Sequence, residues 1–202
     1  MPSPPDLFTT PGPSMWLVRH GETAWARAGR HTGLTDIPLT AIGRQEALDL
    51  VPRLMGHTFA AVVSSPLSRA LDTARLAGFE DQVRIDPDLV EWDYGDDEGR
   101  TTVEIRAERP DWTIWSQGPA GGEPLEAVAE RVDRVIDRAR AIDGITLCFA
   151  HGHLLRILGA RWIGLAPTGG GSLALDTATI SILGWDREAP AIRRWNDGID
   201  LD

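Results

Sequence analysis

The feature that most constrains the fold is an alternation of short apolar runs with longer amphipathic stretches along most of the chain. Strands are predicted at Met15–Arg19, Ala60–Ser64, Val83–Ile85, Ile145–Ala150 and Ala178–Gly184, with a weaker one near Ile192. Helices are predicted over Thr40–Met55, Pro66–Ala77, Thr102–Arg109, Pro124–Ala141 and His153–Ile163. Strands that alternate with helices pair in parallel, and the helices cover both faces of the sheet. The sequence therefore predicts the α/β class, as a three-layer α/β/α sandwich with a mostly parallel central sheet.

The predicted domain spans residues 15–202, a length that suits one domain. Before it, residues 1–14 are rich in proline and lack the basic and apolar segments of a signal peptide. We expect this segment to be a disordered leader, and we expect a cytoplasmic protein. Within the domain, Ser65 is predicted as a helix N-cap, and Pro66 and Pro124 as first helical residues.

Charge and composition exclude several classes of function. The net charge of −10 argues against nucleic acid or an anionic membrane as the main partner. All 20 basic residues are arginine, which excludes mechanisms that need a lysine, such as Schiff-base chemistry or a GxxxxGK[ST] phosphate loop. Cys148 is the only cysteine, so no intrachain disulfide and no thiolate zinc cluster can form. Its apolar neighbours predict a buried packing role.

Arginine and histidine follow the predicted strands at their carboxyl ends, where parallel sheets bind ligands. Arg19 and His20 end the first strand, and Arg69 falls in the first turn of the helix after the second. His151 and His153 follow the fourth strand. Each residue alone would be ordinary at its position. Together they predict a site for a phosphate-like dianion, because guanidinium groups match its geometry and charge.

Five segments together resemble the histidine phosphatase (phosphoglycerate mutase-like) superfamily. They are LVRHGETAW, GRHTGLTDIPLT, SSPLSRALDTA, LVEWDYGDDEG and FAHGH, in that family's order and spacing over about residues 15 to 185. The chain looks most like the branch of compact acid phosphatases and sedoheptulose-bisphosphatase-like sugar phosphatases. The resemblance implies a phosphoric monoester hydrolase that needs no metal or other cofactor and acts on a small phosphorylated metabolite. It is also compatible with a homodimer.

The resemblance implies catalytic roles for five residues. His20 matches the nucleophile that accepts the phosphoryl group and becomes phosphohistidine. Arg19, Arg69 and His151 match the residues that clamp the phosphate. Glu91 matches the acid that protonates the leaving oxygen and then helps to activate water.

Further residues are expected to contact the substrate. Thr32 and Gly33 match a pair that contacts it, and Tyr94 matches a residue of the pocket wall. The remaining residues that we expect to bind substrate are Gly21, Arg100, Gly152 and His153.

This chemistry makes demands on the two central residues. To attack phosphorus, His20 must present an unprotonated ring nitrogen, so its other nitrogen should donate a hydrogen bond, for instance to a backbone carbonyl. Nearby arginine charges lower an imidazole pKa and favour this neutral ring. An alkoxide is a poor leaving group and needs a proton from a carboxyl within reach. Asp93 is the alternative to Glu91 for that role.

Departures from the mutase pattern favour hydrolysis. Ala26 stands where mutases carry Asn, and Arg100 begins a stretch where they carry Lys. Arg109 stands alone where they have an arginine pair, and His153 replaces the Asn of HGN. A cofactor-dependent phosphoglycerate mutase and a catalytically silent phosphate-binding module remain the alternative functions.

The identity of the leaving group depends on a region rich in Trp, Gly and acids, residues 94–122, which we expect to be an irregular insertion over one edge of the sheet. Trp92, Trp112 and Trp115 suggest a wall that stacks on sugar rings, and a core role fits them equally. Our hypothesis is that the substrate is a sugar phosphate. Two further histidines, His31 and His57, fall in loop-like contexts without carboxylate-rich ligand spacing, so no metal site is predicted.

Overall fold

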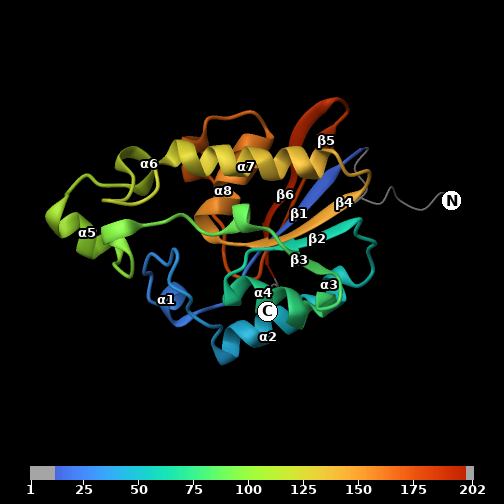
Figure 1. Cartoon of the computed structure of the whole chain (residues 1–202), viewed down its shortest axis with the longest axis horizontal. Coiled ribbons are helices and arrows are strands. Elements are labelled where there is room, and N and C mark those ends of the chain that lie inside the picture. The colour runs from blue at the N-terminus through green and yellow to red at the C-terminus, as the bar shows by residue number, and fades with distance from the viewer. Residues whose placement is uncertain (1–11, 199–202) are drawn as a thin grey trace.

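A six-stranded sheet forms the centre of the computed structural model, which describes residues 12–198 (Figure 1). Its strands are β1 (Ser14–Arg19), β2 (Ala61–Ser64), β3 (Val83–Ile85), β4 (Ile145–Ala150), β5 (Ile180–Asp186) and β6 (Ala189–Asp197). Their order across the sheet is β3-β2-β4-β1-β5-β6. The first four strands pair in parallel, whereas β5 pairs antiparallel with β1 and β6 antiparallel with β5. The predicted mostly parallel sheet is confirmed.

Helices cover both faces of this sheet, which gives the predicted three layers (Figure 1). One face carries α7 (Leu125–Arg140) and α8 (Gly152–Trp162). The other carries α2 (Ala41–Asp49), α3 (Val51–Leu54) and α4 (Ser68–Ala74). The remaining helices are short: α1 (Ala24–Arg27), η1 (Arg75–Phe79), η2 (Pro87–Leu89), η3 (Gly95–Asp97), α5 (Thr102–Glu108), α6 (Ile114–Gln117) and η4 (Pro167–Ser172).

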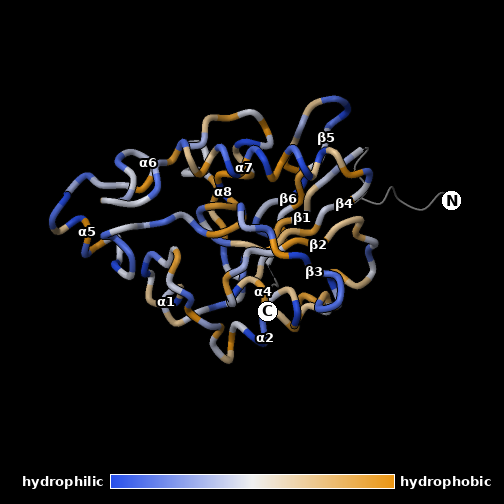
Figure 2. Tube along the Cα trace, in the orientation of Figure 1, coloured by the Kyte–Doolittle hydropathy of each residue, from blue (hydrophilic) through white to orange (hydrophobic). Residues whose placement is uncertain are grey.

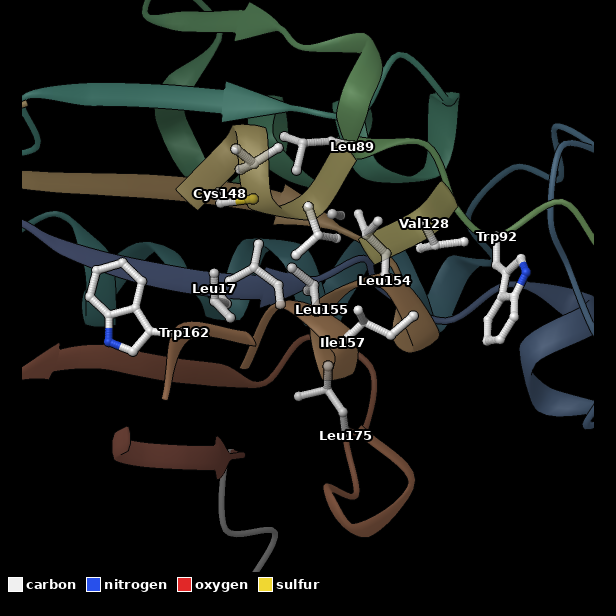
Figure 3. Close-up of a cluster of buried hydrophobic side chains, with 14 of the residues drawn as sticks. Leu17, Leu89, Trp92, Val128, Cys148, Leu154, Leu155, Ile157, Trp162 and Leu175 are labelled. Carbon is white, nitrogen blue, oxygen red and sulfur yellow. The ribbon is translucent and has the colours of Figure 1, made fainter. Parts of the chain in front are cut away.

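The alternation of side chains along a strand divides the core into two clusters. In β1, Met15 and Leu17 join the cluster beneath α7 and α8, whereas Trp16 and Val18 join the cluster on the opposite face. Figure 3 shows the first cluster, with Cys148 lying among its aliphatic side chains. Cys148 is fully buried, and burial raises the pKa of its thiol, so the predicted packing role is confirmed. Figure 2 shows the matching pattern on α7, where hydrophobic and hydrophilic residues alternate along the helix.

Three of the predicted helices differ from the observed ones as follows, and two of the differences have a local reason. The helix predicted over residues 40–55 is divided into α2 and α3, because Pro52 lacks an N–H and its ring conflicts with the carbonyl four residues earlier. The helix predicted from Pro66 begins at Ser68 with Leu67 as N-cap, because the Ser65 hydroxyl accepts from the Leu67 N–H and turns the chain first. Pro124 is the N-cap of α7 rather than its first residue.

The predicted leader lies mostly outside the described residues. Residues 1–11 are not described, and β1 already begins at Ser14, whose N–H donates to the Gly144 carbonyl at 3.0 Å. The sheet therefore starts one residue earlier than predicted. Among residues 12–198, no helix combines the length and the apolar character needed to cross a membrane.

The insertion of residues 94–122 carries η3, α5 and α6 and extends from one end of the sheet (Figure 1). Asp97 anchors it, because its buried carboxylate pairs with Arg109 and Arg100 and accepts the Ala120 N–H at 3.0 Å. Thr101 and Glu104 begin α5 with a capping box, in which each side chain accepts from the other's backbone N–H. The region is thus more ordered than an irregular insertion.

Candidate active site

A cavity of about 180 Å³ opens at the carboxyl edge of the sheet, where β1 and β4 end. The predicted site residues that line it are Arg19, His20, Thr32, Glu91, Tyr94, Gly152 and His153. They come from four parts of the chain: the end of β1, the loop after α1, the segment after η2 and the first turn of α8. Convergence of strand ends is what the α/β topology predicts for a ligand site.

His20 has the hydrogen bonding that a nitrogen nucleophile requires. The residue is 5% exposed, and its Nδ1 lies 2.7 Å from the Gly21 carbonyl oxygen. A carbonyl only accepts, so Nδ1 carries the proton and donates it, and Nε2 retains its lone pair. Burial, together with the charges of Arg19 and Arg69, lowers the pKa of His20 well below its ordinary value. The imidazole is therefore neutral, with an unprotonated nitrogen.

Arg19 supplies positive charge beside His20. One terminal nitrogen donates to the Leu175 carbonyl at 2.6 Å, and its buried Nε has no hydrogen-bond partner among the residues that the structure describes. No carboxylate of residues 12–198 forms an ion pair with it. Gly152 packs against its guanidinium, and a Cβ there would be in ordinary van der Waals contact with Arg19 Nε, at 3.4 Å. A buried N–H donor on a cation with no partner suits an anionic ligand.

Arg69 and His151 lie behind the cavity rather than in its lining. Both are fully buried, and the His151 ring centroid lies 5.3 Å from that of His20. Arg69 Nε donates to His151 Nδ1 at 3.1 Å, so the remaining proton of His151 is on Nε2, which donates to Ser65 Oγ at 2.7 Å. Burial and the charge of Arg69 lower the pKa of His151 well below its ordinary value. Both ring nitrogens of this neutral histidine are already hydrogen-bonded within the protein.

Glu91 is held at the first turn of α8. Its Oε1 accepts from the N–H groups of Trp92 and Leu154, each at 2.9 Å, and its Oε2 accepts from His153 N–H at 3.0 Å. These bonds fix a buried carboxyl group in the cavity that His20 also lines. Asp93, the alternative acid, accepts from Gly95 N–H at 2.9 Å and lies outside the lining.

A cluster of rings forms the wall of the cavity away from His20. The Tyr94 hydroxyl lies 2.6 Å from His153 Nδ1, and the His153 ring stacks on His31 with centroids 5.9 Å apart. Burial lowers the pKa of both histidines, and the positive charge of Arg156 adds to the effect on His153. The wall thus presents neutral polar rings to the cavity.

A model of the histidine phosphatase superfamily (branch 1) matches residues 15–198. The chain belongs to this family. That match covers nearly the whole described structure, including the RHG and HGH segments at the ends of the neighbouring strands β1 and β4. The predicted histidine phosphatase fold and enzyme class are confirmed.

Named relatives of this histidine phosphatase include two phosphatases. It is 41% identical over 177 residues to an acid phosphatase of Mycobacterium tuberculosis, covering 84% of this chain and 85% of the relative. It is 37% identical over 188 residues to the sedoheptulose 1,7-bisphosphatase of Saccharomyces cerevisiae, covering 76% and 68%. A solved structure of an open reading frame from Mycobacterium tuberculosis superimposes with a TM-score of 0.86 at 36% identity, covering 93% of this chain and 99% of that one.

Several residues of the histidine phosphatase cavity were not found from the sequence. Its lining also contains Ala26, Gly29, Arg30, His31, Arg156 and Leu175. Arg156 donates to the carbonyls of Gly170 and Gly171 and lies over the Trp115 ring, with 4.7 Å between the guanidinium carbon and the ring centroid. It lies one helical turn after Gly152 on α8. This spacing on the helix that follows His151 is the signal that would have found it.

Three predicted substrate contacts lie outside the lining. Gly21 packs against the chain at Gly43, where a Cβ on Gly21 would come within 2.2 Å of the Gly43 carbonyl oxygen. Arg100 pairs with Glu108 at 2.6 Å, on the insertion. Gly33 lies between the cavity and the 92–98 segment, and both oxygens of Glu98 accept its N–H at 2.9 Å. All three residues thus make structural contacts with neighbouring parts of the chain outside the cavity lining.

The tryptophans do not form a sugar-stacking wall. Trp92 and Trp112 are buried in the core, and their ring N–H groups donate to the carbonyls of Glu123 and Gly118. Trp115 packs behind His153, with ring centroids 5.3 Å apart. None of the three tryptophans lines the cavity, and the alternative role in the hydrophobic core applies to Trp92 and Trp112. Across residues 12–198, no group of three or more His, Cys, Asp or Glu side chains is arranged to hold a metal ion.

Proposed function

We propose that this histidine phosphatase hydrolyses small phosphomonoesters through a phosphohistidine at His20, with Glu91 as general acid and base. The observation that carries the proposal is the hydrogen bond from His20 Nδ1 to the Gly21 carbonyl at 2.7 Å. It leaves the lone pair on Nε2, and the cavity that His20 lines is also lined by Glu91 and by Arg19, whose buried Nε has no partner among the described residues. A nucleophile, an anion-binding cation and a proton-transfer group are thus adjacent.

In the first step, the lone pair of His20 Nε2 attacks phosphorus and the bond from phosphorus to the ester oxygen breaks. Negative charge on the transferring group is balanced by arginine, mainly by Arg19 in the lining, since electrostatic stabilisation dominates phosphoryl transfer. The departing oxygen takes a proton from Glu91 and leaves as an alcohol. A phosphate ester that binds as its monoanion carries one proton and can supply it to Glu91 beforehand.

In the second step, a water molecule attacks the phosphorus of phosphohistidine. Glu91, now a carboxylate, accepts a proton from that water, and the bond between nitrogen and phosphorus breaks. Inorganic phosphate leaves, and His20 returns to its neutral form. In this scheme Arg69 contributes its positive charge from behind the cavity and does not bind the phosphate directly. Its N–H donors already bind His151 and the backbone carbonyls of the loop after α1.

The substrate we propose is a sugar phosphate in the cytoplasm. Support comes from the polar lining beyond the phosphate end, formed by His31, Thr32, Tyr94 and His153, which offers hydrogen bonds to hydroxyl groups. The relative named for sedoheptulose 1,7-bisphosphate points in the same direction. Trp92, Trp112 and Trp115 do not line the cavity and give no support to this substrate assignment.

The test is phosphate release from a panel of phosphate esters, including sugar phosphates, 3-phosphoglycerate and an aryl phosphate. We expect hydrolysis that His20→Ala abolishes, that a chelator leaves unchanged, and that favours sugar esters. Equal rates across the panel would contradict the sugar assignment. Isomerisation of 3-phosphoglycerate faster than its hydrolysis would favour the mutase alternative, and phosphate binding without turnover would favour the silent module.

A further inference from the structure

The loop of residues 30–35 forms one side of the cavity and contains no helix. It brings Arg30, His31 and Thr32 into the lining. An isolated bridge joins Arg30 to Thr101, and the Leu34 side chain is 50% exposed. The loop's internal hydrogen bond runs from the Thr32 hydroxyl to the Arg30 carbonyl at 3.1 Å, and the rest of its backbone keeps its shape through contacts made by other parts of the chain.

Two side chains of opposite charge hold the backbone of this loop. Arg69 donates to the carbonyls of Thr32 at 3.1 Å, Gly33 at 2.8 Å and Thr35 at 2.9 Å. Glu98 accepts the N–H of Gly33 with both oxygens at 2.9 Å and the N–H of Thr35 at 3.2 Å. The guanidinium of Arg69 binds carbonyl oxygens of the loop, and the carboxylate of Glu98 binds its N–H groups. Both kinds of backbone group are therefore held by a charged side chain.

The loop also lies against the segment that carries the proposed acid. A Cβ on Gly33 would come within 2.5 Å of the Trp92 carbonyl oxygen and 2.7 Å of Glu98 Oε2. It would also come within 3.0 Å of Tyr94 Cδ2. Glu98 therefore connects two walls of the cavity, the loop with His31 and the segment with Glu91 and Tyr94.

We propose that Glu98 is a positioning residue that sets how the leaving group of the substrate is bound. Its side chain does not line the cavity, and no arginine among residues 12–198 forms a salt bridge with it. The carboxylate instead binds the loop that faces the leaving group. The phosphate end is built separately, from Arg19, the last residue of β1, and His20, which follows it. This inference rests on the proposed phosphatase activity, and it predicts that Glu98 affects ester binding more than phosphate binding.

The experiment compares Glu98→Ala and Glu98→Gln with the wild type in steady-state kinetics on the best ester of the panel. We expect Glu98→Ala to raise KM about tenfold and to change kcat less than about threefold, because the phosphoryl end stays intact. The competitive inhibition constant of inorganic phosphate should stay within about twofold of the wild type. Glu98→Gln retains one acceptor oxygen and should recover most of the affinity for the ester.

A matched control removes a carboxylate that also accepts a backbone N–H but lies away from the cavity. Asp86 accepts from Asp88 N–H at 3.0 Å at the start of η2, so Asp86→Ala should leave KM unchanged. Hydrogen exchange of the peptide covering residues 30–37 gives a readout independent of turnover, and Glu98→Ala should speed it.

The outcomes separate this inference from the proposed function. An unchanged KM in folded Glu98→Ala, an equal rise in KM and in the phosphate inhibition constant, or a fall in kcat alone would overturn the positioning role. If Glu98→Ala does not fold, the same three criteria apply to Glu98→Gln, for which we expect a smaller rise in KM than for Glu98→Ala. Wild-type protein that hydrolyses no ester would overturn the proposed function and with it the kinetic part. The exchange measurement would still show whether Glu98 holds the loop.

Discussion

Glu91 Oε1 accepts the backbone N–H of Leu154 at 2.9 Å, and this bond joins the segment after η2 to the first turn of α8. The neighbouring His153 N–H donates to Oε2 at 3.0 Å. One carboxyl group thereby occupies the N-terminus of the helix that follows β4, where unpaired N–H groups and the helix dipole favour it. The same contacts hold it in the lining of the cavity that His20 also lines.

Replacement of Glu91 by Gln should make the rate depend more strongly on the leaving group. The amide keeps the size of the side chain but gives no proton, so kcat for an alkyl or sugar ester should fall by about 10²–10⁴-fold. An ester with a nitrophenolate leaving group needs little protonation and should lose far less in the phosphorylation step. Single-turnover rates with the two ester types measure the difference. A similar loss with both would contradict general acid catalysis by Glu91.

Arg69→Lys should destabilise the protein although it keeps the positive charge. The guanidinium binds His151 Nδ1 and three loop carbonyls, and one ammonium group cannot reach all four acceptors. Each buried acceptor left unpaired costs about 1–3 kcal/mol, so we expect the free energy of unfolding to fall by about 2–4 kcal/mol. Urea unfolding measures this loss.

Arg75→Lys is the control for that substitution. Arg75 forms an exposed ion pair with Asp72 at 3.2 Å, and such pairs contribute little, so a change within about 0.5 kcal/mol is expected. A value for Arg69→Lys equal to that of Arg75→Lys would show that Arg69 does not hold the loop and His151 in place.

Stability should fall as the pH drops below about 6.5. His20, His151 and His153 all have a pKa lowered well below 6.5, chiefly by burial. Below the unfolded pKa, the unfolded chain binds protons that the folded protein does not bind, so the free energy of unfolding decreases until the folded pKa is reached. Each such histidine contributes up to about 1.4 kcal/mol per pH unit.

Urea unfolding at pH 7.5, 6.5 and 5.5 measures this dependence. His153→Asn should reduce the slope by the contribution of one proton. Asp88, whose pKa is lowered by its hydrogen bond with Arg134, loses its contribution only as the pH falls through and below 3.8, outside this window. A free energy of unfolding that is constant between pH 7.5 and 5.5 would contradict the buried neutral histidines.

The sheet and the reactive end of the cavity could be predicted from sequence because both depend on local patterns. The apolar runs around Leu17 and Cys148 are too short and too continuous for surface helices, and the residue types that follow them mark the strand ends. The family resemblance covers the segments of His20 and Glu91, and the structure places both residues in the lining of one cavity. The hydrogen bond from His20 Nδ1 to a backbone carbonyl was also expected, because a nitrogen nucleophile would require it.

The opposite wall could not be predicted, because it depends on distant contacts. His31 looked exposed in its loop, yet the fold stacks it on His153, 122 residues further along the chain. Arg156 became a lining residue only through the packing of α8, and Arg69 turned away from the cavity because the carbonyls of the folded loop offered it acceptors. The break in the predicted helix at Pro52 is different, since proline alone was sufficient warning.

Trapping the phosphoenzyme tests the central claim most directly. Wild-type protein is mixed with a ³²P-labelled ester, quenched within milliseconds, and digested for mass spectrometry of the peptide that contains Arg19 and His20. We predict a label on His20 that is stable in base, lost in acid, and absent from His20→Ala. Its formation should keep pace with the first turnover. Turnover at the wild-type rate without any labelled intermediate, or a label that persists in His20→Ala, would contradict phosphoryl transfer to His20.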